Sequence, residues 1–144
     1  MGNIAIVSCT SSDLTPEQAA ALDVRLVPLK VSFGGETFDT VTELSNEAFY
    51  EKLTAPGAPF PQTAAANPAQ FESAFREALE ATGRSQILVT GMETHVCVYQ
   101  TTRDLVQRGL TVHVVEDAVI SRTEENHRIG LGLMQQAGAV RTGT

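Results

Sequence analysis

Cysteine is scarce in this chain: only two of its 144 residues are cysteines, Cys9 and Cys97. Two thiols so far apart in the sequence do not make the framework of a disulfide-stabilised secreted domain. The sequence therefore predicts two reduced thiols. A bond between them is expected only if their Cα atoms lie about 4.4–6.8 Å apart.

Long apolar runs and basic residues are also in short supply. No run approaches the roughly 20 residues that span a bilayer. The N-terminus has no basic segment followed by an apolar one, so no secretory signal is predicted and the cytoplasm is the expected location. Ten Lys and Arg face 17 Asp and Glu, a net charge of −7. This balance disfavours nucleic acids and anionic membranes as partners, because both bind basic surfaces.

Motifs for metals and cofactors are missing as well. The three histidines, His95, His113 and His127, fall on three separate predicted elements, without the ligand spacing of a zinc site. Residues 8–12 follow the first predicted strand and contain no glycine, which excludes a dinucleotide fingerprint there. The sequence therefore predicts neither a metal site nor a cofactor.

What the chain does contain is a regular alternation of strand and helix patterns. Short apolar runs predict five strands, at residues 3–8, 24–32, 86–90, 111–116 and 139–142. Capping and proline signals predict helices between them, at residues 15–22, 45–53, 67–82, 94–108 and 121–138.

This alternation predicts a single α/β domain over residues 1–144. The expected architecture has three layers and is doubly wound, of the Rossmann or flavodoxin type. Its sheet is mainly parallel, with five strands in the order 2-1-3-4-5. Pro28 cannot donate to a strand ladder, so the second strand is expected at an edge.

The most specific stretch of sequence surrounds Cys97. In a doubly wound sheet, ligands bind beyond the carboxyl ends of the strands where the strand order reverses, which here follows the first and third strands. Cys97 falls in the first turn of the helix after the third strand. Free backbone N–H groups and the helix dipole favour a thiolate there and could hold an oxyanion. The position predicts either a nucleophile or, as the plainer alternative, a small core residue.

Five motifs in the second half then point to a family. They are GMETHVCVYQT at 91–101, RG at 108–109, VVEDAV at 114–119, SR at 121–122 and AGAV at 137–140. Residues 85–142 resemble the isochorismatase-like cysteine hydrolases. The resemblance implies that Cys97 is the nucleophile and that the turn before it holds an oxyanion, with a cis peptide between Met92 and Glu93. Thr94 begins the helix, where a small anion could bind.

The same resemblance implies two further catalytic groups. One is an Asp at the end of the first strand, acting as the base, and the other is a Lys at the end of a middle strand. Cys9 stands in the place of that Asp, and a thiol is a poor substitute for a carboxylate base. The only lysines are Lys30 and Lys52, and Lys30 lies on the second predicted strand, outside the family's lysine context. Of the three catalytic groups that the resemblance implies, only the cysteine is present at its expected place.

The first half carries a different set of motifs. Among them are DLTPE at 13–17, VPLKVSFGGE at 27–36, FYEKL at 49–53 and PQT at 61–63. Residues 3–81 resemble the N-terminal domain of the DegV family of fatty-acid-binding proteins. The resemblance implies a carboxylate-binding hydroxyl at Thr63 and places Cys9 where that family also has an Asp. Alanine replaces the serine expected beside Thr63, and the family's second domain is absent.

These two resemblances lead to three hypotheses. The first is an engineered chimera of a DegV-like half (1–84) and an isochorismatase-like half (85–144), without a complete active site and with no function beyond folding. The second is a small cysteine hydrolase that uses Cys97. The third is a fatty-acid or small-anion binding protein that uses Cys9, Thr63 and Thr94. The second half could also retain surface for subunit contacts, so a homodimer is an open alternative.

Overall fold

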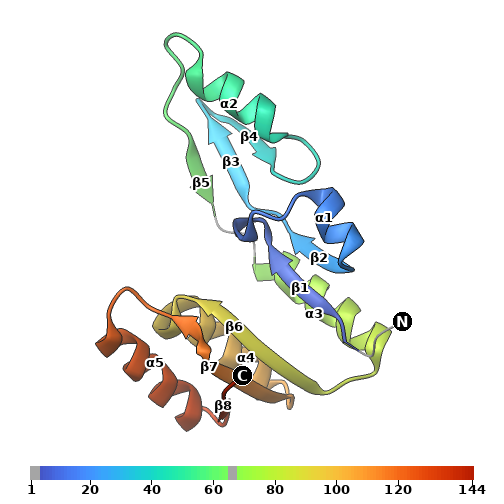
Figure 1. The fold of residues 1–144 in the computed structure, drawn as a ribbon, viewed down its shortest axis with the longest axis vertical. Helices are drawn as coiled ribbons and strands as arrows, with labels where there is room; N and C mark the ends of the chain where they lie inside the picture. Colours follow the sequence, from blue (N-terminus) through green and yellow to red (C-terminus); the bar gives the residue numbers. More distant parts are fainter. Residues whose placement is uncertain (1–3, 65–67) are drawn as a thin grey trace. The chain divides into compact units, whose positions relative to one another are not determined.

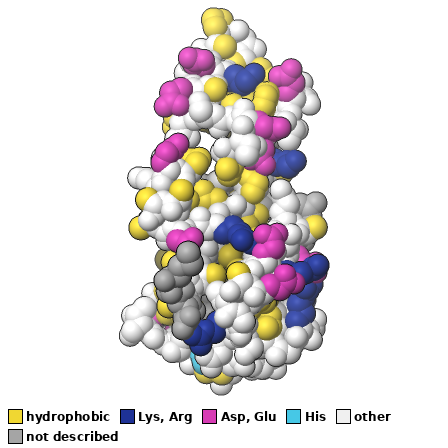
Figure 2. Space-filling view, turned by 90° about the vertical axis from the view of Figure 1, so that its right-hand side faces the viewer, with side chains coloured by type: hydrophobic (Ala, Val, Ile, Leu, Met, Phe, Trp, Pro, Cys, Tyr) yellow, Lys and Arg dark blue, Asp and Glu magenta, His cyan; other side chains and the backbone are white. Residues whose placement is uncertain are grey.

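The computed structural model describes residues 4–64 and 68–144, and the chain divides into two compact units. Unit 1 is Met1–Gly83 and unit 2 is Arg84–Thr144. Within the described ranges, no helix has the length and apolar character that crossing a membrane requires. On the face drawn in Figure 2, the acidic side chains are scattered and interspersed with Lys and Arg side chains. The net negative charge therefore does not gather into one patch on this face.

The described residues of unit 1 form two small sheets and three α-helices (Figure 1). Its elements are β1 (Ile6–Cys9), a 3₁₀ turn (Thr10–Ser12), α1 (Pro16–Ala21), β2 (Val24–Val27), β3 (Lys30–Phe33), β4 (Glu36–Asp39), α2 (Asn46–Thr54), β5 (Gln62–Ala64) and α3 (Pro68–Thr82). Strands β1 and β2 pair in parallel, whereas β3 pairs antiparallel with β4 on one side and β5 on the other.

A break at Pro28 separates the two sheets of unit 1. The sequence predicts one strand over residues 24–32, but β2 ends at Val27 and β3 begins at Lys30. The backbone of Leu29 forms hydrogen bonds with side chains: its N–H donates to Thr10 Oγ1 at 2.9 Å, and its carbonyl accepts from Thr40 Oγ1 at 2.9 Å. Pro28 has no N–H to offer a neighbouring strand. The chain therefore leaves the parallel pair at this point and starts a second sheet.

The second sheet of unit 1 is built around a tight hairpin. Gly34 and Gly35 both have positive φ, 55° and 100°, a conformation that glycine adopts at little cost. They connect β3 to β4, and Phe33 faces Glu36 across the ladder. Helix α2 covers this sheet, with a small core of Val31, Phe33 and Leu44 against which Phe38, Ala48, Phe49 and Leu53 pack. Helix α3 instead packs on the parallel pair, through Ala74 and Phe71 against Val27.

Unit 2 is a parallel three-stranded sheet in the order β6-β7-β8. Its elements are β6 (Gln86–Met92), a π-helical turn η2 (Thr94–Val98), α4 (Tyr99–Gln107), β7 (Thr111–Ile120), α5 (Glu124–Gln136) and β8 (Val140–Thr142). Helices α4 and α5 contact each other and β7, so both cover the same face of the sheet. Val112, Val114 and Met134 are almost completely buried between them.

The expected single five-stranded sheet in the order 2-1-3-4-5 is not what the described strands form. They make three sheets, β1-β2, β4-β3-β5 and β6-β7-β8, so the fold is α/β with parallel and antiparallel pairings mixed. The break at Pro28 and the hairpin at Gly34 and Gly35 explain the difference, since they turn the end of the second predicted strand into the centre of an antiparallel sheet. Strands β4 and β5 lie in segments where the sequence predicts no strand.

The core of unit 2 should be sensitive to truncation at Met134. This side chain is 0% exposed, whereas its neighbour Leu133 on the same helix is 36% exposed. We expect M134A to lower the free energy of unfolding by about 2–4 kcal/mol, because it leaves a cavity that the sheet cannot fill. L133A serves as the matched control and should cost clearly less. Urea denaturation of the three proteins gives both values, and equal losses would contradict the burial of Met134.

Candidate functional site

The candidate site is the segment that leaves the carboxyl end of β6. Gly91, with φ 115°, and a register shift against β7 between Val89 and Gly91 bend the strand at this point. The peptide bond between Met92 and Glu93 is cis, as the resemblance implies. Helical backbone then begins at Thr94 and continues through η2 into α4. Cys97 lies in the first turn of this helical segment and its side chain is exposed.

The backbone carbonyl of Glu93 organises that first turn. It accepts the N–H of Val96 at 3.0 Å and the N–H of Val98 at 3.2 Å. These two donors flank Cys97 in the sequence, so the position of the thiol follows from the position of Glu93. In the structure, Cys97 itself is exposed to solvent, and among the described residues no hydrogen bond to its Sγ is formed.

The carboxylate of Glu93 is tied to the loop that follows β7. Arg122 donates to it twice, from Nε at 3.0 Å and from its backbone N–H at 3.3 Å. His95 Nδ1 lies 3.9 Å from the same carboxylate and 3.0 Å from Ser121 Oγ. The Glu93 side chain is only 23% exposed. A carboxylate this far from water needs such partners, because burial without them is costly.

Thr94, which the sequence predicts as a ligand-binding residue, faces inward. It is 0% exposed, and its hydroxyl lies 3.1 Å from His127 Nδ1 on α5. The hydroxyl is thus engaged within unit 2, and ligand binding by Thr94 stays a prediction. Met92, by contrast, is 69% exposed.

Helix α5 approaches the turn so closely that a side chain has no room between them. A Cβ atom added to Gly130 would lie 2.7 Å from His95 N and 2.8 Å from Thr94 C. Gly130 is buried, and both atoms belong to backbone, which cannot rotate away. The sequence interpretation missed Gly130, His127 and the role of Arg122. Their only sequence signal is the Ser121-Arg122 motif, since contacts between elements about 30 residues apart leave no local pattern.

The predicted ligand residues of unit 1 lie on separate elements of that unit. Cys9 ends β1, packs against the cluster of Val27 and Ala74, and places its Sγ 2.7 Å from Ser11 Oγ. Thr63 is exposed on β5, where it pairs with Val31. Both cysteines are free. The described residues hold no group of three or more His, Cys, Asp or Glu arranged for a metal ion.

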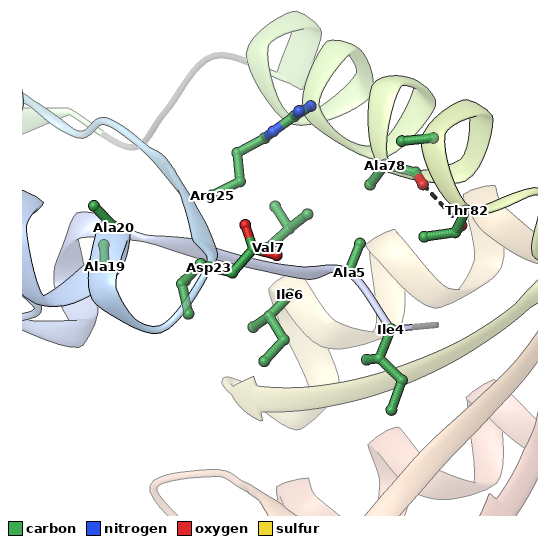
Figure 3. Close-up of a pocket in the computed structure, with 12 residues that line it drawn as sticks. Ile4, Ala5, Ile6, Val7, Ala19, Ala20, Asp23, Arg25, Ala78 and Thr82 are labelled. Atoms are coloured by element: carbon green, nitrogen blue, oxygen red, sulfur yellow. Dashed lines mark hydrogen bonds between the residues drawn. The ribbon is translucent and has the colours of Figure 1, made fainter. Parts of the chain in front are cut away.

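Unit 1 also has an open hollow of about 430 Å³ (Figure 3). Strands β1 and β2 and helices α1 and α3 line it, with aliphatic side chains such as Ile6 and Val7 and the polar side chains of Asp23 and Arg25. None of the six predicted site residues lines this hollow. Arg25 is already engaged by Glu77 at 2.7 Å, so its charge is not free for a ligand.

The strand, the cis turn and the cysteine in the following helical turn define the class of protein: an α/β chain that exposes a thiol at a strand-to-helix junction. The sequence profile of the isochorismatase domain matches residues 3–144, almost the whole chain. The chain therefore belongs to the isochorismatase family.

Similar sequences come from isochorismatase-family and DegV-domain proteins. The chain is 50% identical over 56 residues to "Secreted isochorismatase effector Isc1" of Phytophthora sojae, a match that covers 39% of this chain and 27% of that protein. It is 44% identical over 78 residues to a "DegV domain-containing protein" of Deinococcus radiodurans, covering 54% of this chain and 27% of that protein. The chain thus matches little more than a quarter of the length of these relatives.

Solved structures of both kinds share the fold. YcaC from Pseudomonas aeruginosa, solved with hexane-2,5-diol and covalent acrylamide, has a TM-score of 0.57 at 19% identity, covering 96% of this chain and 55% of that one. A fatty-acid-binding DegV family protein from Thermus thermophilus has a TM-score of 0.59 at 23% identity, covering 92% of this chain and 52% of that one.

The hypothesis of an engineered chimera that only folds is wrong. One family profile extends across both sides of the supposed seam near residue 84. The isochorismatase-family relatives are natural proteins, from Phytophthora sojae and Dictyostelium discoideum among others. The motifs that suggested two origins lie within a chain that one family describes.

Replacing Gly130 by alanine should disturb the turn that carries Cys97. We expect G130A to destabilise unit 2 by about 1–3 kcal/mol, because the new methyl group overlaps the backbone of Thr94 and His95. Gly132 lies in the same helix, and a Cβ there meets nothing within 4 Å. G132A should therefore be neutral or stabilising by about 0.5–1 kcal/mol, the helix-propensity gain of alanine. Urea denaturation separates the two, and a G130A as stable as G132A would disprove the close approach.

Proposed function

We propose that the chain is a small cysteine hydrolase of the isochorismatase family and that Cys97 is its nucleophile. The observation that carries this proposal is the placement of Cys97: an exposed thiol in the first helical turn beyond the carboxyl end of a parallel strand. Membership of the isochorismatase family over residues 3–144 supports it. The substrates would be amides or esters.

The proposed chemistry uses the positive end of the helical segment. The Cys97 thiolate attacks a carbonyl carbon, the S–C bond forms, and the carbonyl electron pair moves to oxygen. Backbone N–H groups at a helix start stabilise such an oxyanion. The tetrahedral intermediate collapses, expels the leaving group and leaves a thioester. Water then hydrolyses the thioester to the free acid and restores the thiol.

Activated substrates suit this protein best. The resemblance implies an Asp as the base, and Cys9 stands in its place, so the family's carboxylate is not supplied at that position. A p-nitrophenyl ester avoids the need for a strong acid or base, because its leaving group departs as a stable anion. Acrylamide is a second probe, since it is bound covalently in the YcaC structure. In that reaction a thiolate adds to the terminal carbon of the double bond and the neighbouring carbon takes up a proton.

Turnover of p-nitrophenyl acetate should depend on Cys97. We expect C97A to lose at least about tenfold of the hydrolysis rate, because it removes the exposed thiol, and the other cysteine, Cys9, is partly buried in unit 1. Acrylamide should add once to the wild-type chain, and peptide mass mapping should place the adduct on Cys97. The matched single-thiol variants separate the two cysteines: C9S should keep the adduct, whereas C97S should lose it. Hydrolysis by C97A at the wild-type rate would refute the proposal.

A second candidate function is fatty-acid binding by unit 1. The observation that favours it is the 44% identity over 78 residues to the DegV domain-containing protein of Deinococcus radiodurans. The resemblance assigns the carboxylate to the hydroxyl of Thr63, and that residue is exposed on β5.

Native mass spectrometry with palmitate tests this second candidate. We expect one bound palmitate per chain and a loss of about tenfold in its affinity in T63A, the cost of one hydrogen bond to a charged group. T42A removes another exposed threonine hydroxyl of unit 1 and should bind palmitate like the wild type. No bound palmitate, or equal weakening in both variants, would count against it.

A further inference from the structure

Glu93 occupies an unusual position in unit 2, because both its backbone and its side chain hold the turn that carries Cys97. Its carbonyl accepts the N–H groups of Val96 and Val98, the two residues that flank the cysteine. Its carboxylate accepts two hydrogen bonds from Arg122, which lies 29 residues later in the chain. Glu93 thereby connects the loop after β7 to the first turn of the Cys97 helix, beside the neutral contact of His95 with Ser121.

The groups that face this carboxylate come from two elements. Arg122 provides the nearest charge, and His95 Nδ1 lies 3.9 Å away and also contacts Ser121. The other contacts between α5 and the turn, Thr94 with His127 and the close approach at Gly130, involve no carboxylate. The pair of Glu93 and Arg122 is therefore the charged member of a set of otherwise neutral contacts.

The two partners differ in how much they contribute to packing. The Arg122 side chain is 83% exposed, whereas the Glu93 side chain is 23% exposed. Removing the guanidinium thus takes away little buried surface but leaves a half-buried carboxylate with one charged partner fewer. Hydrogen bonds to a charged group are directional and stronger than neutral ones. Their loss should be felt as displacement of Glu93 rather than as unfolding.

We propose that Glu93 and Arg122 are positioning residues for the nucleophile: their charged pair fixes the Glu93 carbonyl and, through it, the place of the Cys97 thiol at the helix start. This inference rests on the proposed function for its kinetic consequence. The rate at which iodoacetamide alkylates the Cys97 thiol does not depend on the proposed function and therefore provides an independent test.

R122A is the main test, with R141A as the matched control. Arg141 forms a similar pair in the same unit, with Nε 3.0 Å and a terminal nitrogen 2.6 Å from the Glu116 carboxylate, but it contacts neither the turn nor the loop after β7. We expect R122A to change the rate of Cys97 alkylation and to lower kcat for p-nitrophenyl acetate by about five- to tenfold, with KM within about twofold. R141A should leave both rates at the wild-type value, and both variants should melt at similar temperatures.

Conservative variants distinguish positioning from a general structural role. R122K keeps the charge and should recover about half of the rate lost in R122A, because an ammonium group can still pair with the Glu93 carboxylate but lacks the planar geometry of the guanidinium. E93Q keeps the shape of Glu93 but not its charge and should resemble R122A. If R122A alkylates and turns over like R141A while C97A is inactive, the positioning inference fails and the hydrolase proposal stands. If C97A is as active as the wild type, the hydrolase proposal fails, and the alkylation rates alone decide whether the pair positions the thiol.

Discussion

The contact between helix α5 and the turn after β6 is the constraint on which unit 2 depends. Gly130 lies against the backbone of Thr94 and His95, at a distance that admits no side chain. Because the two segments touch there, the Thr94 hydroxyl reaches His127 and the Glu93 carboxylate reaches Arg122. The turn is thus stabilised by residues that follow it by about 30 positions in the sequence. Cys97 then stays exposed at the start of a helix whose geometry is fixed.

Unit 1 is organised differently, with two small cores in place of one. The parallel pair β1-β2 is covered by α3, and the antiparallel sheet β4-β3-β5 is covered by α2. Its predicted ligand residues have local surroundings: Cys9 sits beside Ser11 and Thr63 lies exposed on β5. The hollow of this unit is lined by other residues, and Arg25 at its wall is already paired with Glu77.

The two resemblances found in the sequence show how much short motifs reveal about fold and about family. Capped helix starts and buried strands recur in every doubly wound fold, because they satisfy backbone donors and bury apolar surface. A DegV-domain protein is nevertheless among the relatives, 44% identical over 78 residues, so this part of the resemblance is confirmed. The isochorismatase profile over residues 3–144 corrects the view of two joined halves. The segment around Cys97 is more informative, since it places an exposed thiol at a helix start directly after a parallel strand.

Local signals by themselves determined most of the elements and the place of Cys97. Thr15 and Ser45 cap helices where the sequence indicates, and β6 and β7 begin at the predicted residues, because capping and apolar runs act over a few positions. Only the tertiary structure decided that residues 30–33 form the centre of an antiparallel sheet and that Thr94 turns inward to His127. It also decided that Gly130 and Arg122 hold the turn. Strand partners and contacts between distant elements depend on which surfaces pack together in the folded chain. Local sequence patterns do not predict these long-range contacts.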